Sequence, residues 1–146
     1  MICYFDTAAL VPLLIPEPSS PVCRQLWDDA DDVLTTEVTF VEAAGALAQA
    51  VRSGRITESR ATEALGELDA YWRELNTIEI TGSLVRRAAG LTSLQALRPY
   101  DALQCASAES ARQPDLIFVS GDRRLLKAGA NLGMHLADVN APMPTH

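Results

Sequence analysis

The stretch Ile2–Asp6, ICYFD, joins four residues typical of a buried strand to a carboxylate. An ionised carboxylate is costly to bury unless it is paired, hydrogen-bonded or bound to a metal. The pattern recurs at residues 116–122, LIFVSGD, where an apolar run ends in Ser120, Gly121 and Asp122. Two buried strands that each deliver an acid at their carboxyl end predict a site at one edge of a parallel sheet.

Between and beyond these two runs, the hydrophobic periodicity alternates between that of strands and that of helices. Further strands are expected at VLTT, TIEI and MHLADV, which are residues 33–36, 77–80 and 134–139. Helices are expected at residues 7–17, with an interruption at Pro12, and at 19–30, 37–54, 56–75, 83–97, 100–112 and 122–129. This alternation predicts an α/β fold, a three-layer α/β/α sandwich with a parallel sheet of four to five strands.

Length, hydropathy and charge narrow the class of protein. The 146 residues are 48% hydrophobic, enough for one domain over residues 1–146. No apolar run reaches the roughly 18–20 residues of a membrane span, and the first residues do not resemble a signal peptide, so we expect a cytoplasmic protein without membrane contact. The net charge of −7 argues against coating of nucleic acid by bulk electrostatics, but allows a nuclease whose acids are neutralised by metal ions.

Histidine and cysteine usage removes other kinds of site. His135 and His146 are the two histidines of the sequence, which leaves little material for a catalytic triad or a His-rich metal site. The three cysteines, Cys3, Cys23 and Cys105, are widely spaced among apolar residues and form no CxxC pair. We therefore expect them to be reduced and part of the core.

Four acids are candidates for one metal site, and each also has an ordinary structural explanation. Asp6 and Asp122 both precede a helix, and Asp is a preferred N-cap. Glu42 lies in mid-helix on a largely apolar side, where it either extends to solvent or needs compensation. Asp101 lies in the first turn of a helix, where it interacts favourably with the helix dipole. Carboxylates that converge without a basic partner favour a hard divalent cation, Mg²⁺ or Mn²⁺.

Four segments in this order resemble the successive motifs of the PIN-domain family. They are FDTAALVPLLIPEP, VEAAGALAQA, YDALQCASA and FVSGDRRLLKAG, residues 5–18, 41–50, 100–108 and 118–129. Each motif is loose by itself, but the set covers essentially the whole chain. Within the family, this chain, which is small and has a single domain, resembles the VapC ribonuclease toxins of type II toxin–antitoxin systems. The resemblance implies a Mg²⁺-dependent endoribonuclease, a hydrolase acting on phosphodiester bonds.

The resemblance also assigns roles to particular residues. It implies that the metal ligands and catalytic acids are Asp6, Glu42, Asp101 and Asp122, and that Thr7 and Ser120 are hydroxyls that support the metal shell. One or two Mg²⁺ ions, or Mn²⁺ in their place, would activate a water for attack on RNA and leave a 5′-phosphate and a 3′-hydroxyl. The chain departs from the family pattern at Pro12, where many relatives have a polar residue, and at Gly121.

The implied partners are RNA, a cognate VapB-like antitoxin and a second copy of the chain in a homodimer. Arg123, Arg124 and Lys127 follow Asp122 on one helix and either contact RNA phosphates or form a solvated basic face. The antitoxin would place a short segment across the helices near the acids, with an arginine in the acidic site. Large apolar residues are candidates for that groove or for a homodimer face, with core packing as the alternative for each: Trp27, Leu47, Leu65, Tyr71 and Trp72.

Two other classes of function compete with the nuclease. A catalytically inactive PIN-fold module that only binds proteins has no chemical reason to keep four acids together, so the acids argue against it. A phosphatase with an aspartyl nucleophile would match FDTAA, but Ala8 stands where a phosphatase of the haloacid-dehalogenase type needs its second aspartate.

Overall fold

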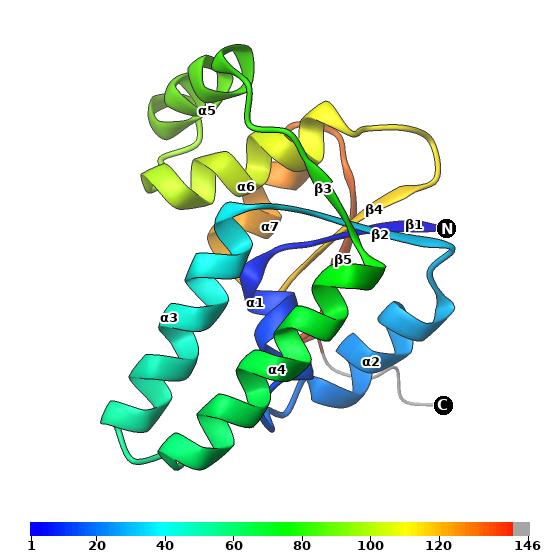
Figure 1. The fold of residues 1–146 in the computed structure, drawn as a ribbon. Helices are drawn as coiled ribbons and strands as arrows, with labels where there is room; N and C mark the ends of the chain where they lie inside the picture. Colours follow the sequence, from blue (N-terminus) through cyan, green and yellow to red (C-terminus); the bar gives the residue numbers. More distant parts are fainter. Residues whose placement is uncertain (142–146) are drawn as a thin grey trace.

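The strands form one five-stranded parallel sheet (Figure 1). The computed structural model describes residues 1–141, so His146 and the end of the expected domain lie outside the described residues. The strand order is β3-β2-β1-β4-β5. The bounds are β1 Ile2–Phe5, β2 Asp32–Thr36, β3 Asn76–Ile78, β4 Leu116–Ser120 and β5 His135–Asp138. The predicted parallel sheet is confirmed.

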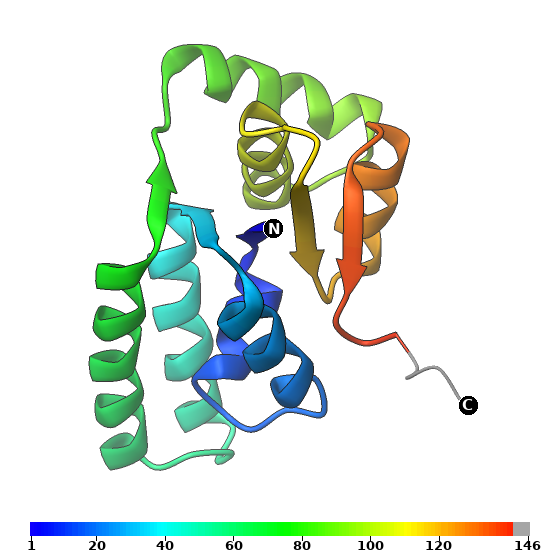
Figure 2. The same ribbon diagram turned by 90° about the vertical axis from the view of Figure 1, so that its right-hand side faces the viewer.

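Helices cover both faces of the sheet (Figures 1 and 2). One face carries α1 Thr7–Leu10, the 3₁₀ helix η1 Val11–Leu13, α2 Ser20–Asp29, α3 Val38–Arg52 and α4 Glu58–Glu74. The other carries α5 Gly82–Leu94, α6 Pro99–Ser110 and α7 Arg123–Asn131. Alternate residues of β1 enter the two cores, Cys3 and Phe5 on the first face and Tyr4 on the second. Over residues 1–141, every helix is too short or too polar to cross a bilayer.

Three predicted boundaries shift for local reasons. The helix expected over residues 7–17 ends as α-helix at Leu10, because Pro12 lies in the 3₁₀ turn that follows. Strand β3 stops at Ile78 rather than residue 80, because Ile78 pairs with the last residue of β2. Helix α5 ends at Leu94 rather than residue 97, and Ala96 then adopts a left-handed φ of 52°.

Most of the large apolar residues considered for a partner surface belong to the core. Leu47 is fully buried, and Trp27, Tyr71 and Trp72 are partly buried against the same core cluster. Edge-on aromatic contacts hold the indole rings in place, including one between Trp27 and Tyr71 with centroids 4.8 Å apart. Leu65 differs from the other four because it is exposed. Core packing is therefore confirmed for four of the five residues.

Gly129 allows helix α7 to pack closely on strand β4. A Cβ added at this position would lie 2.9 Å from Cδ1 of Phe118 and 2.8 Å from Cδ2 of Leu136. Because the Phe118 ring is fully buried and hard to displace, we expect Gly129→Ala to lower the free energy of unfolding by about 1–3 kcal/mol. This loss opposes the gain of up to about 1 kcal/mol that Ala offers in a helix.

Gly66, in the middle of helix α4, provides the matched control. A Cβ added there meets nothing within 4 Å, so we expect Gly66→Ala to raise the free energy of unfolding by about 0.5–1 kcal/mol. Urea unfolding followed by circular dichroism measures both variants. Similar shifts in the same direction would show that close packing at Gly129 has no energetic weight.

Candidate active site

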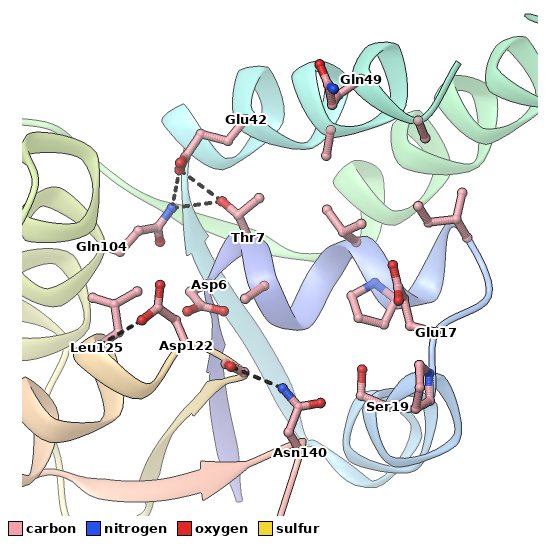
Figure 3. A pocket seen from close by; sticks show the side chains of 18 of the residues that line it. Asp6, Thr7, Glu17, Ser19, Glu42, Gln49, Gln104, Asp122, Leu125 and Asn140 are labelled. Atoms are coloured by element: carbon pink, nitrogen blue, oxygen red, sulfur yellow. Dashed lines mark hydrogen bonds between the residues drawn. The ribbon is translucent and has the colours of Figure 1, made fainter. Parts of the chain in front are cut away.

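A pocket of about 520 Å³ opens beside the carboxyl ends of strands β1 and β4. The chain continues from β1 to β2 on one side of the sheet and occupies β4 and β5 on the other, so this is the point where the strand order switches. The four predicted acids all line the pocket. They come from the turn after β1, from α3, from α6 and from the turn before α7: Asp6, Glu42, Asp101 and Asp122. Figure 3 shows Asp6, Glu42 and Asp122 around the pocket.

Asp6 is the most deeply placed acid, with 1% of its surface exposed. Its Oδ1 accepts a hydrogen bond from the backbone N–H of Ala9 at 2.9 Å, which confirms its expected role as the N-cap of α1. Its Oδ2 accepts a hydrogen bond from Oγ of Ser120. Loss of hydration raises the pKa of Asp6 from 3.8 to about 7, although these two hydrogen bonds oppose the rise. Capping therefore does not offset the cost of burying this carboxylate, which has no ion pair among residues 1–141.

Ser120 connects Asp6 to the second strand-end acid. Its Oγ accepts a hydrogen bond from the backbone N–H of Asp122 at 2.9 Å. Oδ1 of Asp122 in turn accepts from the backbone N–H of Arg124 at 2.8 Å, so Asp122 is the N-cap of α7. The hydroxyl predicted to support the site thus orders both acids, and each acid also caps a helix.

Gly121, one of the two departures from the family pattern, lies where the chain passes close to Asn140. A Cβ at residue 121 would lie 2.9 Å from Nδ2 of Asn140. That nitrogen donates a hydrogen bond to the carbonyl oxygen of Gly121 at 3.1 Å. Glycine at residue 121 therefore leaves room for the side chain of Asn140, and this departure from the family pattern replaces none of the four acids. Pro12, the other departure, is buried and lines the pocket.

Glu42 is partly buried and compensated by hydrogen bonds rather than extended into solvent. Its Oε1 accepts from Oγ1 of Thr7 and from Nε2 of Gln104, each at 2.9 Å (Figure 3). Gln104 was not predicted as a site residue. The available signal was a glutamine three residues after Asp101 in a helix otherwise rich in small residues.

The expectation that the acids converge without a basic partner is wrong at Asp101, which is paired with an arginine. Nε of Arg98 lies 3.3 Å from its Oδ2, across one turn at the start of α6. The Arg98 side chain is 72% exposed, so this pair is worth no more than about 1 kcal/mol. Arg55 also lines the pocket and is paired with Glu17 at 2.8 Å. The acids therefore converge with two cations at their margin.

A family model described as PIN domain matches residues 3–131. The chain belongs to the PIN-domain family. This PIN domain is 34% identical over 134 residues to Ribonuclease VapC45 of Mycobacterium tuberculosis strain CDC 1551 / Oshkosh and to Ribonuclease VapC49 of strain ATCC 25618 / H37Rv. Each match covers 92% of this chain and 93% of the relative, so the PIN domain is a homologue of VapC ribonucleases.

Solved structures share the fold of this PIN domain. PAE2754 from Pyrobaculum aerophilum superposes with a TM-score of 0.66 and 22% identity, over 88% of this chain and 84% of that chain. A chain of a toxin–antitoxin complex from Klebsiella pneumoniae superposes with a TM-score of 0.60 and 20% identity, over 94% of this chain and 97% of that chain. The family resemblance inferred from the four motifs is confirmed.

The pocket of this PIN domain fits a hard divalent cation by the chemistry of its donors. The four predicted carboxylates line it together with Glu17, which is paired with Arg55. Asp6 is buried without an ion pair among residues 1–141. In the same residues, no three His, Cys, Asp or Glu side chains are grouped closely enough to hold a metal ion by themselves. Mg²⁺ keeps several waters and is commonly held by one or two carboxylates. The residues present therefore suit an ion that is bound largely through water.

The basic residues of helix α7 lie outside this pocket. Arg123, Arg124 and Lys127 are exposed and form no ion pair within the described part of the chain. Arg124 and Lys127 line another surface hollow, which they share with the chain between α5 and α6. Their contact with RNA phosphates stays a prediction.

Proposed function

We propose that this PIN domain is a metal-dependent endoribonuclease and the toxin of a type II toxin–antitoxin pair. The observation that carries the proposal is the gathering of four carboxylates in one pocket at the switch point of the sheet. The 34% identity to the ribonucleases VapC45 and VapC49 supports RNA as the substrate.

The side chains of the pocket have different proposed roles, in holding a cation or in orienting the acids. The described lining holds five acids, one of which, Glu17, is paired with Arg55, and no histidine. It therefore offers no imidazole base and repels a phosphodiester unless its charge is neutralised. Asp6, Glu42, Asp101 and Asp122 would hold Mg²⁺ or Mn²⁺. When bound, the cation would stabilise charge on the phosphate and activate the attacking water. Thr7 and Ser120 orient Glu42 and Asp6 through the hydrogen bonds already described.

An antitoxin and a second copy of the chain complete the proposal. The structural likeness to a chain of a toxin–antitoxin complex supports a partner of that class. An acidic pocket that is open to solvent suits a cationic side chain from the antitoxin, which would occupy the place of the cation. Arg123 and Arg124 are the proposed contacts to RNA phosphates beside the pocket, since they are exposed and unpaired within the described residues.

Incubation of the purified chain with total cellular RNA tests the proposal. With Mg²⁺ we expect discrete cuts that leave 5′-phosphates, which ligation-based mapping of the new ends detects. EDTA should abolish the cuts, and excess Mg²⁺ should restore them. Cleavage that survives EDTA would contradict metal dependence, whereas folded protein that cuts no RNA with either cation would favour the protein-binding module. Co-purification of a small protein encoded next to this chain tests the antitoxin.

A further inference from the structure

Gln104 lies at the centre of a buried hydrogen-bonded network beneath Glu42. Its side chain is 1% exposed. Its Nε2 donates to Oε1 of Glu42 at 2.9 Å and to Oγ1 of Thr39 at 2.8 Å. Its Oε1 accepts from the hydroxyl of Tyr4 at 2.8 Å. Gln104 therefore joins β1, α3 and α6, which lie in different layers of the sandwich.

Two threonine hydroxyls determine which end of the amide faces Glu42. The carbonyl oxygen of Phe5 can only accept, so Oγ1 of Thr35, 2.7 Å away, must donate to it. Oγ1 of Thr39 lies 2.8 Å from Oγ1 of Thr35. Since the proton of Thr35 is already donated to Phe5, the hydroxyl of Thr39 must donate its proton to Oγ1 of Thr35. Thr39 can then only accept from residue 104. The group that faces Thr39 and Glu42 is thus the NH₂ of the glutamine.

The network holds one oxygen of Glu42 and leaves the other free. Oε1 receives hydrogen bonds from Gln104 and Thr7. Among residues 1–141, no group donates to Oε2, and Glu42 lines the acidic pocket. We propose that Gln104 is a positioning residue, which fixes Oε1 of Glu42 so that Oε2 is available to a divalent cation in the pocket. The inference rests on the proposed function only where RNA cleavage is the readout.

Glutamine is the residue type that this position requires. A leucine of similar size offers no donor, and Glu42 would then keep only the hydroxyl of Thr7. A glutamate places acceptor oxygens against both Thr39 and Glu42. Either change releases the Glu42 carboxylate from its fixed orientation without removing any acid from the pocket.

Calorimetric titration of the full chain with Mg²⁺ measures this effect without RNA. Positioning partners of metal ligands typically contribute 10- to 100-fold to metal affinity or activity. We therefore expect Gln104→Leu to weaken Mg²⁺ binding about 10- to 100-fold and to lower kcat for RNA cleavage by a similar factor. Cys105→Ala is the matched control, since Cys105 is fully buried on the same helix and makes no hydrogen bond to Gln104 or Glu42 among the described residues. Its Mg²⁺ affinity should equal that of the original protein.

A double-mutant cycle separates positioning from general structural damage. If Gln104 acts through Glu42, Gln104→Leu should change Mg²⁺ affinity by less than about twofold in a Glu42→Gln background. An undiminished loss in that background, or no loss in the single variant, would overturn the inference. Should Gln104→Leu fail to fold, Tyr4→Phe removes the anchor of the amide and should weaken Mg²⁺ binding about 3- to 10-fold. An unchanged affinity in Tyr4→Phe would then overturn it.

The two proposals fail in different ways. If the original chain binds Mg²⁺ but cuts no RNA, the proposed function fails, whereas the affinities still judge the role of Gln104. If the original chain cuts RNA in Mg²⁺ and the Gln104 variants bind and cut as it does, only the positioning role is lost.

Discussion

Asp6→Asn is expected to lower RNA cleavage at least about a thousandfold and, at the same time, to stabilise the metal-free protein. A catalytic cation supplies several kcal/mol of transition-state stabilisation, which corresponds to such a factor. Asn caps helices nearly as well as Asp, so the hydrogen bond from the backbone N–H of Ala9 can be kept. The variant should therefore lose the ligand and keep the fold.

The stabilisation depends on pH with a definite sign. Burial raises the pKa of Asp6 to about 7 from 3.8, so the folded state keeps a proton that the unfolded state releases. In the original protein, stability from this group therefore falls as pH rises from about 4 to 7 and is constant above. Asn carries no charge, so its advantage should be near zero at pH 4 and reach about 2–4 kcal/mol at pH 8.

Urea unfolding in EDTA at several pH values, beside cleavage assays in Mg²⁺, measures both effects. Addition of Mg²⁺ should raise the midpoint of the original protein and leave that of Asp6→Asn almost unchanged. A variant that is less stable than the original protein at pH 8 would show that the ionised carboxylate is not costly in this position. Retained cleavage would remove Asp6 from the set of ligands.

Asp101→Asn is expected to lower cleavage about a hundredfold with little effect on stability. Asp101 is less buried than Asp6, with 16% of its side chain exposed, and it lies in the first turn of α6. Loss of its favourable interaction with the helix dipole should cost at most about 1 kcal/mol. Cleavage rates and urea midpoints of this variant, compared with those of Asp6→Asn, separate the two acids.

Arg98→Gln is the control for the effect at Asp101. Arg98 is the cation beside that carboxylate, at 3.3 Å, and competes with a divalent ion for it. Its removal should leave cleavage intact and tighten Mg²⁺ binding by about two- to fivefold, because the exposed pair is weak. If Arg98→Gln abolished cleavage as Asp101→Asn does, the ion pair itself would be the functional unit.

The layers of the fold were predictable because the buried strands are recognisable in the sequence. ICYF and LIFVS are continuous apolar runs that end in polar residues, and a parallel sheet places such ends at one edge. Exact ends were less predictable, since they depend on pairing. Strand β3 ends at Ile78 because Ile78 pairs with the last residue of β2, so residues beyond it have no partner on that strand. No local pattern in TIEI marks that point.

The acids of the site were predictable, but their neighbours were not. Asp6 directly follows β1 and Asp122 follows β4 after one glycine, so the pairing of these two strands brings the acids together. Gln104 contacts Tyr4 and Glu42, which are 100 and 62 residues away in the chain. Such contacts arise only when both helical layers pack on the sheet. The pairing of Asp101 with Arg98 was within reach, because the two residues are one helical turn apart.

The bond between Ser120 and Asp6 spans 114 residues and has a consequence for synthesis on the ribosome. A growing chain contains Asp6, Glu42 and Asp101 well before it contains Ser120 and Asp122. Until β4 has been synthesised, β1 lacks the strand that pairs with it opposite β2. The pocket then also lacks the residues that β4 and the turn after it provide. The proposed metal site therefore stays incomplete during most of the translation of the chain. Under the proposed function, an antitoxin made in that interval would meet the toxin before it can cut RNA.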